Sequence, residues 1–151
     1  MTSESAASTP ITTIDHLRDH VGKDVTIRGW LYNKRSSKKL HFLELRDGNG
    51  IVQAVIVQGE VSDDLFQRAD KLQQETSMVV TGTVREHAKR KGEYELGVKH
   101  FEVIGAPARE YPISPKEHGT DFLMDNRHLW LRSKRQHAIM RVRHEIISAV
   151  R

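Results

Sequence analysis

The chain has 151 residues, of which 37% are hydrophobic and 29% charged, and it contains no cysteine. This composition fits one ordinary domain with a short additional segment, and it excludes disulfide frameworks, thiolate metal sites and cysteine nucleophiles. The net charge of +4 is uneven, because residues 127–151 hold seven basic residues and one acid. The main domain therefore lacks the broad cationic surface of a sequence-independent nucleic-acid binder.

The N-terminal residues 1–12 are rich in Ser, Thr and Ala and lack the basic start and apolar core of a signal peptide. No apolar run approaches the roughly 18 residues that a membrane-spanning helix needs. We therefore expect a disordered tail on a cytoplasmic protein with no membrane contact. The nine histidines show no metal-ligand spacing, so we predict no metal site.

A short helix is expected after Thr13, which can cap it, and Gly22 suits its C-terminal end. Alternating apolar and polar residues then predict β-strands. The third expected strand follows an Asp-Gly-Asn-Gly turn that is typical of a hairpin. The expected strands cover residues 24–34, 40–46, 51–57, 78–85 and 93–104, and a helix capped by Ser62 is expected over residues 62–72. In the last strand the inward phase shifts, which indicates a β-bulge near Lys99 and His100.

The order of three strands, one helix and two strands predicts an all-β fold for residues 13–106. It is the layout of the OB-fold, a five-stranded Greek-key barrel with one helix between strands three and four. The alternative is an SH3-like barrel, which normally lacks a helix of this length. We expect a closed barrel from about Val21 to Ile104.

After Ile104 three prolines within nine residues, Pro107, Pro112 and Pro115, predict a hinge over residues 107–133 that packs little against the barrel. A new helix is expected from Lys134 to the last residue, Arg151, with an apolar stripe at helical spacing. The stripe consists of Ala138, Ile139, Val142, Ile146 and Val150. Because this helix has no stop signal, we expect residues 134–151 to begin a further domain of a longer protein.

Phe42 is the first candidate for a binding residue. In the second strand His41, Leu43 and Leu45 share one face, and the aromatic Phe42 shares the other with Glu44 and Arg46. One interpretation is that a neighbouring loop or strand covers the ring, because isolated exposed apolar residues are common. The other is a stacking platform for a base, because OB-folds bind single-stranded nucleic acid with aromatic side chains on this part of the barrel.

Two further features lie close to Phe42 in the sequence. Residues 34–39 contain four cations, Lys34, Arg35, Lys38 and Lys39, and no acid, so they form either a solvated loop or a phosphate-contacting edge. Gln53 lies in an otherwise apolar strand, where its amide needs hydrogen-bond partners. The amide is either structural or available to read the edge of a base.

These residues lie in segments that resemble the anticodon-binding domain of the aspartyl, asparaginyl and lysyl tRNA synthetases, which belong to subclass b of class II. The segments are GWLYNKR at residues 29–35, HFLELRD at 41–47 and GIVQA at 50–54. The resemblance implies that Phe42 stacks on a central anticodon uridine, that Gln53 hydrogen-bonds it and that Arg35 assists. Lys34, Lys38 and Lys39 are expected phosphate contacts.

The segments from Tyr111 to Arg132 are similar to the hinge of asparaginyl-tRNA synthetases, and the helix after Ile139 to the opening of class II motif 1. The resemblance implies a parent asparagine–tRNA ligase, a homodimer that uses ATP and Mg²⁺ at a site beyond this chain. The chain itself is expected to bind tRNA as a monomer, with no catalytic residue and no cofactor. The alternatives are an aspartyl-tRNA synthetase, a free-standing OB-fold binder of single-stranded nucleic acid, and a purely structural module.

Overall fold

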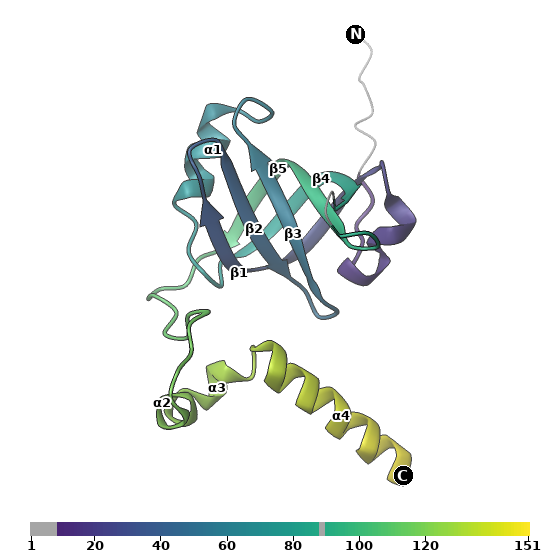
Figure 1. Cartoon of the computed structure of the whole chain (residues 1–151), viewed down its shortest axis with the longest axis vertical. Helices are drawn as coiled ribbons and strands as arrows, with labels where there is room; N and C mark the ends of the chain where they lie inside the picture. The colour runs from purple at the N-terminus through teal and green to yellow at the C-terminus, as the bar shows by residue number, and fades with distance from the viewer. Residues whose placement is uncertain (1–8, 88–89) are drawn as a thin grey trace. The chain divides into compact units, whose positions relative to one another are not determined.

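The computed structural model describes residues 9–87 and 90–151. The chain divides between Glu110 and Tyr111 into two compact units, and each is described by itself. Figure 1 shows the elements of both. The first unit contains a 3-10 helix η1 (Ile14–His20), the strands β1 (Asp24–Ser36), β2 (Leu40–Arg46), β3 (Ile51–Val57), β4 (Ser77–Glu86) and β5 (Tyr94–Gly105), and the helix α1 (Asp63–Asp70). The second contains α2 (Thr120–Asp125), α3 (Arg127–Trp130) and α4 (Lys134–Val150).

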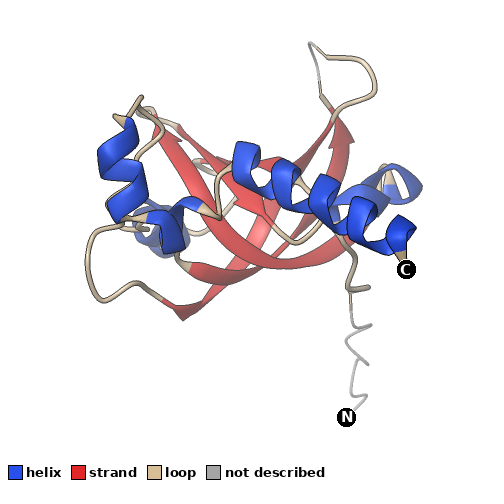
Figure 2. Ribbon diagram, turned by 90° about the horizontal axis from the view of Figure 1, so that it is seen from below, coloured by secondary structure: helices blue, strands red, loops and turns tan. Residues whose placement is uncertain are grey.

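The five strands close into a barrel in the order β1-β2-β3-β5-β4, with β4 pairing back to β1. Figure 2 shows the strands in red and the helices in blue. All pairs are antiparallel except β3 and β5, which run parallel where Ala54 faces Leu96. This arrangement confirms the predicted OB-fold and its single helix between strands three and four. The predicted bulge is present, because Thr81 faces His100 and Gly82 faces Val98, which leaves Lys99 unmatched in the β4–β5 ladder.

The barrel is filled by one apolar core. The alternation expected for β2 and β3 is observed, with every second residue buried along both strands. The helix α1 begins at the predicted cap, where the Ser62 hydroxyl accepts a hydrogen bond from the Leu65 amide at 3.3 Å, and it buries Leu65 and Ala69 in the core. The largest buried side chains are Phe101, Leu17, Ile27, Leu31, Leu43, Leu45, Ile56, Met78 and Leu96.

The N-terminal segment is fastened to the barrel. The amide of Thr26 donates to the Pro10 carbonyl at 2.9 Å, and the amide of Thr12 donates back to the Thr26 carbonyl at 3.0 Å. The tail predicted for residues 1–12 is therefore too long, because residues 10–12 pair with β1; its first eight residues lie outside the described residues.

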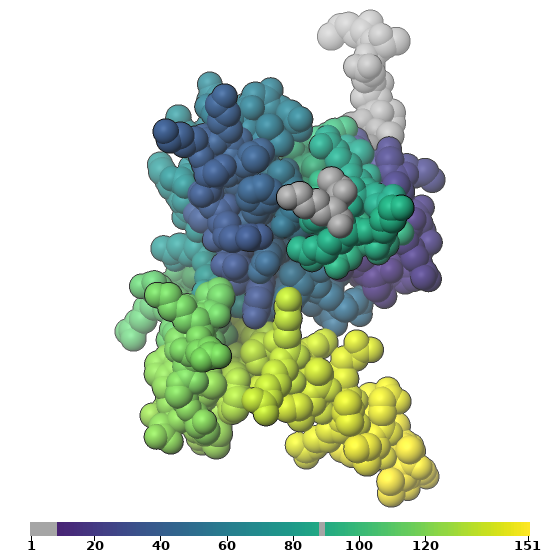
Figure 3. Space-filling model, viewed as in Figure 1, coloured from purple at the N-terminus to yellow at the C-terminus, as the bar shows by residue number. Residues whose placement is uncertain are grey.

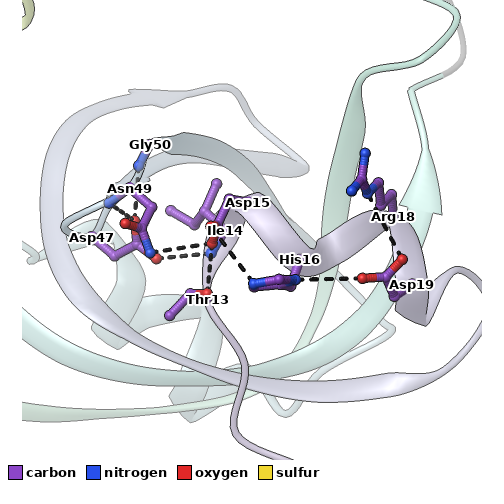
Figure 4. A network of polar contacts seen from close by, with 9 residues as sticks. All are labelled: Thr13, Ile14, Asp15, His16, Arg18, Asp19, Asp47, Asn49 and Gly50. Atoms are coloured by element: carbon purple, nitrogen blue, oxygen red, sulfur yellow. Dashed lines mark hydrogen bonds and ion pairs between the residues drawn. The ribbon is translucent and has the colours of Figure 1, made fainter.

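The 3-10 helix η1 is tied to the β2–β3 turn by one carboxylate. Asp47 accepts hydrogen bonds from the amides of Ile14, Asn49 and Gly50 at 2.8, 2.7 and 2.9 Å (Figure 4). Two of these bonds shape the predicted Asp-Gly-Asn-Gly turn, and the third joins residues 33 positions apart. Asp47 thus fixes one end of the barrel. The β1–β2 turn lies at the other end of β2.

The second unit is helical. The segment predicted as a hinge contains α2 and α3, which the proline pattern did not indicate, and the Tyr111 hydroxyl donates to the Leu129 carbonyl at 2.9 Å. The helix α4 begins where expected, with the Ser133 hydroxyl accepting from the Gln136 amide at 3.3 Å. No helix among the described residues is long and apolar enough to cross a membrane.

Candidate nucleic-acid interface

The outward face of β1, β2 and β3 carries the predicted binding residues, and it faces the viewer in Figure 1 and in the space-filling view of Figure 3. On β2 the side chains of His41, Leu43 and Leu45 are buried, and those of Phe42 and Glu44 are only half-buried. Phe42 is therefore placed on the outside of the barrel, as its position in the alternation predicts.

A β-bulge in β1 places Arg35 on the same face as Phe42. From Val25 to Leu31 the odd-numbered positions point into the barrel, and an unbroken strand would send Arg35 inward as well. The register with β2 shifts between Leu31 and Asn33, and the extra residue reverses the phase of the rest of the strand. Arg35 then faces Phe42 across the ladder, and it is exposed.

Arg35 and Phe42 form a cation–π pair. The guanidinium carbon of Arg35 lies 5.9 Å from the centroid of the Phe42 ring, which is within the range of about 6 Å for such contacts. Both groups are planar, and both stack well on nucleobases. The pair offers an aromatic surface beside a fixed positive charge, which suits one base and the phosphate next to it.

Gln53 lies on the next strand with its amide held by a carboxylate. Its backbone faces Glu44 on β2 and Glu95 on β5, and its amide nitrogen donates to a Glu95 carboxylate oxygen at 3.4 Å. Because the nitrogen is directed at Glu95, the amide oxygen is the atom left to accept a hydrogen bond from a ligand. Glu44 and Glu95 were not predicted to belong to the site, although the alternation of β2 and β5 places both on the outer face.

The ladder arranges these side chains in two neighbouring rows across the face. One row runs through Arg35, Phe42 and Val55, and the other through Asn33, Glu44, Gln53 and Glu95. Neighbouring strands lie about 4.8 Å apart and successive outward residues of a strand about 6.7 Å apart. Phe42 and Gln53 are therefore diagonal neighbours on adjacent strands.

The four cations of the β1–β2 segment do not act together. Lys38 and Lys39 lie exposed in the turn, which is fixed by a hydrogen bond from the Ser37 amide to the Leu40 carbonyl at 2.8 Å. Lys34 differs from the expectation, because its ammonium group donates to the carbonyls of Ala69, at 3.3 Å, and Asp70.

Lys34 is therefore a cap of helix α1 and not part of the outer face. The bulge that turns Arg35 outward also sets Lys34 opposite the buried Leu43. Burial lowers the pKa of the Lys34 ammonium, and the Asp70 carboxylate partly opposes that effect. A lysine at the C-terminal carbonyls of a helix complements the helix dipole. The expected phosphate contacts are accordingly reduced to Lys38 and Lys39.

In residues 9–87 and 90–151 no group of three or more His, Asp or Glu side chains is placed to hold a metal ion. The Phe42 ring, the Gln53 amide and the Arg35 guanidinium offer stacking, hydrogen bonding and charge, which are the means by which proteins recognise single-stranded nucleic acid.

Comparison with known proteins agrees with this geometry. Residues 25–104 match the family model described as OB-fold nucleic acid binding domain. The chain is 62% identical over 142 residues to an asparagine–tRNA ligase of Sorangium cellulosum (strain So ce56), which covers 94% of this chain and 32% of that protein.

Solved structures give the same result. The chain is similar to the asparaginyl-tRNA synthetase of Pyrococcus horikoshii, with a TM-score of 0.76, 38% identity, and coverage of 87% of this chain and 31% of that one. It is also similar to the Entamoeba histolytica asparaginyl-tRNA synthetase in complex with asparaginyl-adenylate, with a TM-score of 0.74, 30% identity, and coverage of 91% and 33%. The chain spans about a third of the length of these relatives.

Proposed function

Because the chain belongs to the family of OB-fold nucleic acid binding domains, we propose that it is the anticodon-binding part of an asparagine–tRNA ligase. The observation that supports this most directly is the grouping of Arg35, Phe42 and Gln53 on one outward face. The three residues lie on three different strands, and their grouping has no evident use in the packing of the barrel.

Phe42 and Arg35 supply affinity in this proposal. A single-stranded anticodon base stacks on the Phe42 ring, and the guanidinium beside the ring offsets the charge of the neighbouring phosphate. Lys38 and Lys39 add contacts to the RNA backbone from the turn. None of these contacts depends on the identity of the base, because every base has a stacking surface and every nucleotide a phosphate.

Gln53 supplies discrimination. With its amide nitrogen held by Glu95, the amide oxygen accepts the N3–H of a uridine that stacks on Phe42. Cytidine has an acceptor at N3, so two acceptors would face each other and the bond would be lost. Glu95 therefore fixes the orientation of the Gln53 amide. In this orientation the amide selects uridine as the central base of the anticodon.

The relatives support asparagine as the amino acid of the whole protein. The relatives at 30–62% identity described above carry asparagine in their names, whereas aspartyl-tRNA synthetases with similar structures are 22–23% identical. The whole protein would join asparagine to tRNA at the expense of ATP, with Mg²⁺, as a homodimer. No residue of this chain is assigned to that chemistry.

Binding of the 151-residue chain to tRNA transcripts tests the proposal. An asparagine tRNA transcript should bind more tightly than the same transcript with its anticodon changed at the central base, at one fixed salt concentration. An aspartate tRNA transcript, which shares the central uridine, should lose less affinity than the central-base variant. Equal binding of all the transcripts would leave a general binder of single-stranded nucleic acid and remove the proposed function.

A further inference from the structure

A small polar cluster lies where β1 ends and β2 begins, next to the Arg35–Phe42 pair in the β1–β2 ladder. Its centre is His41, the neighbour of Phe42, which is 2% exposed. The ring nitrogen Nδ1 of His41 lies 2.9 Å from the Ser36 hydroxyl at the end of β1. The imidazole packs against the Phe66 ring of α1, with 4.2 Å between the ring centroids.

His41 is expected to lower the stability of the fold relative to an apolar residue at this position. The other inward positions of β2 are leucines, Leu43 and Leu45, and an apolar side chain would continue the core. The Nε2 atom of His41 is buried and makes no hydrogen bond among the described residues, and leaving a buried polar atom unsatisfied costs about 1–3 kcal/mol. A buried imidazole with an unsatisfied atom, which contacts the end of β1 beside the binding face, points to a role in the β1–β2 turn.

Several charged or polar groups face the imidazole. From β1 comes the ammonium of Lys34, and from α1 come the carboxylate of Asp70 and the backbone of Phe66. Burial lowers the pKa of His41; Lys34 lowers it further, and Asp70 and the Phe66 backbone oppose the shift. The folded protein thus favours the neutral ring, which agrees with its enclosure among Ser36, Phe66 and the end of α1.

We propose that neutral His41 is a positioning residue of the RNA-binding face, which holds the β1–β2 turn in the conformation that binds RNA, and that protonation of its ring releases this turn. The Ser36 hydroxyl, the Asp70 carboxylate and the Phe66 backbone do not fully compensate a buried imidazolium beside the Lys34 ammonium, because the cost of burial is larger. The imidazolium becomes stable only when water reaches it, and Ser36 and the turn are the part of its enclosure that is exposed. This inference rests on the proposed function only where RNA is concerned.

The direction of the pH effect follows from the lowered pKa. Above the ordinary histidine value of about 6.5 both the folded and the unfolded chain are neutral at this site, so stability is unaffected. As the pH falls below that value, His41 binds a proton more readily in the unfolded chain than in the folded chain. The folded conformation, which includes the β1–β2 turn, therefore loses stability. RNA affinity should then fall in acid, whereas protonation of exposed histidines would raise it by adding positive charge.

Nuclear magnetic resonance of the 151-residue chain, without RNA, tests the turn itself. The His41 ring should titrate below the ordinary value, and the Ser37 and Lys39 amides should shift with the same midpoint. In His41→Asn, whose amide can still hydrogen-bond Ser36 but does not titrate, these amides should not respond to pH. In Ser36→Ala, a change at an exposed position, His41 should titrate while the turn amides no longer follow it.

Two outcomes overturn the inference. One is a Ser37 amide that keeps its acid response in His41→Asn, and the other is a His41 ring that titrates at or above the ordinary value. His100→Asn, the same change at an exposed position on β5, is the matched control, and it should leave the response of the turn intact.

Binding to an asparagine anticodon stem–loop at about pH 7.5 and about pH 5.5, on either side of the ordinary histidine pKa, then tests the link to RNA. The wild-type chain should lose affinity several-fold in acid, and His41→Asn should bind equally at both values. Absence of wild-type binding at the higher pH would remove the proposed function, and the magnetic resonance result would still decide the turn. Equal acid losses in both proteins would overturn the link between His41 and binding.

Discussion

At the scale of single residues, the proposed binding of RNA depends most on the Phe42 ring. Phe42→Ala should weaken binding of an asparagine anticodon stem–loop by about 1–3 kcal/mol, the usual worth of a base–aromatic stack. Phe42→Leu should lose nearly as much while keeping the apolar bulk, because leucine has no planar surface for a base. Titration calorimetry at fixed salt measures both. Wild-type affinity in Phe42→Leu would show that the ring only fills space beside Arg35.

Lys38 should act through charge alone. Lys38→Ala should weaken every RNA by the same factor and lower the slope of log affinity against log salt by about 0.7, as the loss of one single-strand phosphate contact does. Lys71→Ala, a change at an exposed lysine on the α1 side of the barrel, is the control and should leave the slope unchanged. An effect of Lys38→Ala that depends on the anticodon would contradict a backbone role.

Alternation and resemblance together were sufficient to predict the positions of Phe42 and Gln53, but not the role of Lys34. In the sequence Lys34 is one of four neighbouring cations and does not differ from the others. The bulge between Leu31 and Asn33 decides which of them face outward. Residues 32–36 contain no aliphatic side chain that would show the shift of phase, unlike the bulge in β5, so the capping contact of Lys34 could not be predicted. His41 was assigned correctly to the buried face, but its contact with Ser36 depends on the same shifted register.

At the scale of elements, two glycines allow the strands to approach one another closely. A Cβ atom at Gly29 would lie 2.4 Å from the Arg46 carbonyl oxygen, and one at Gly82 would lie 2.3 Å from that of Gly97. In both cases the obstacle is backbone, which cannot turn aside as a side chain would. These contacts are part of how β1 and β4 curve into the closed barrel.

Gly29→Ala should therefore lower the free energy of unfolding by roughly 1–3 kcal/mol or more, the usual cost of forcing extra volume into a packed region. Gly48→Ala is the matched control, because a Cβ atom there would contact nothing within 4 Å. Urea denaturation of both variants gives the comparison. A Gly29→Ala protein as stable as Gly48→Ala would mean that the two strands can separate at no cost.

The strands and α1 were predictable because their apolar residues repeat at the spacing of a strand or a helix. Residues such as the helix cap Ser62 and the turn residue Asp47 mark where these elements begin or end. The parallel pairing of β3 with β5 was not, since it joins Gln53 to Glu95 across 42 positions and leaves no local pattern. The helices α2 and α3 have six and four residues, which is too short for a hydrophobic period to appear. The prolines therefore predicted only a hinge for residues 107–133, without these two helices.

At the scale of the whole molecule, α4 presents its apolar stripe to solvent. Ile139, Val142, Ile146 and Val150 are 47%, 60%, 60% and 83% exposed. We expect the 151-residue chain to be monomeric in dilute solution, with the amides of α4 exchanging with solvent much faster than those of the barrel, because a single unpacked helix is marginal in water. Sedimentation and hydrogen exchange measure the two properties. A stable dimer that persists after deletion of residues 135–151 would contradict this expectation.

If the barrel selects an anticodon through its central base, exchanging that base should change the binding affinity. Two asparagine anticodon stem–loops that differ only in having uridine or cytidine at the central position are bound to the wild-type chain and to Gln53→Ala. The wild type should prefer uridine, and Gln53→Ala should narrow that preference while keeping the stacking on Phe42, because only the amide reads the base edge. An unchanged preference for uridine in Gln53→Ala would show that Gln53 is a structural amide, and no preference in the wild type would contradict anticodon selection by this face.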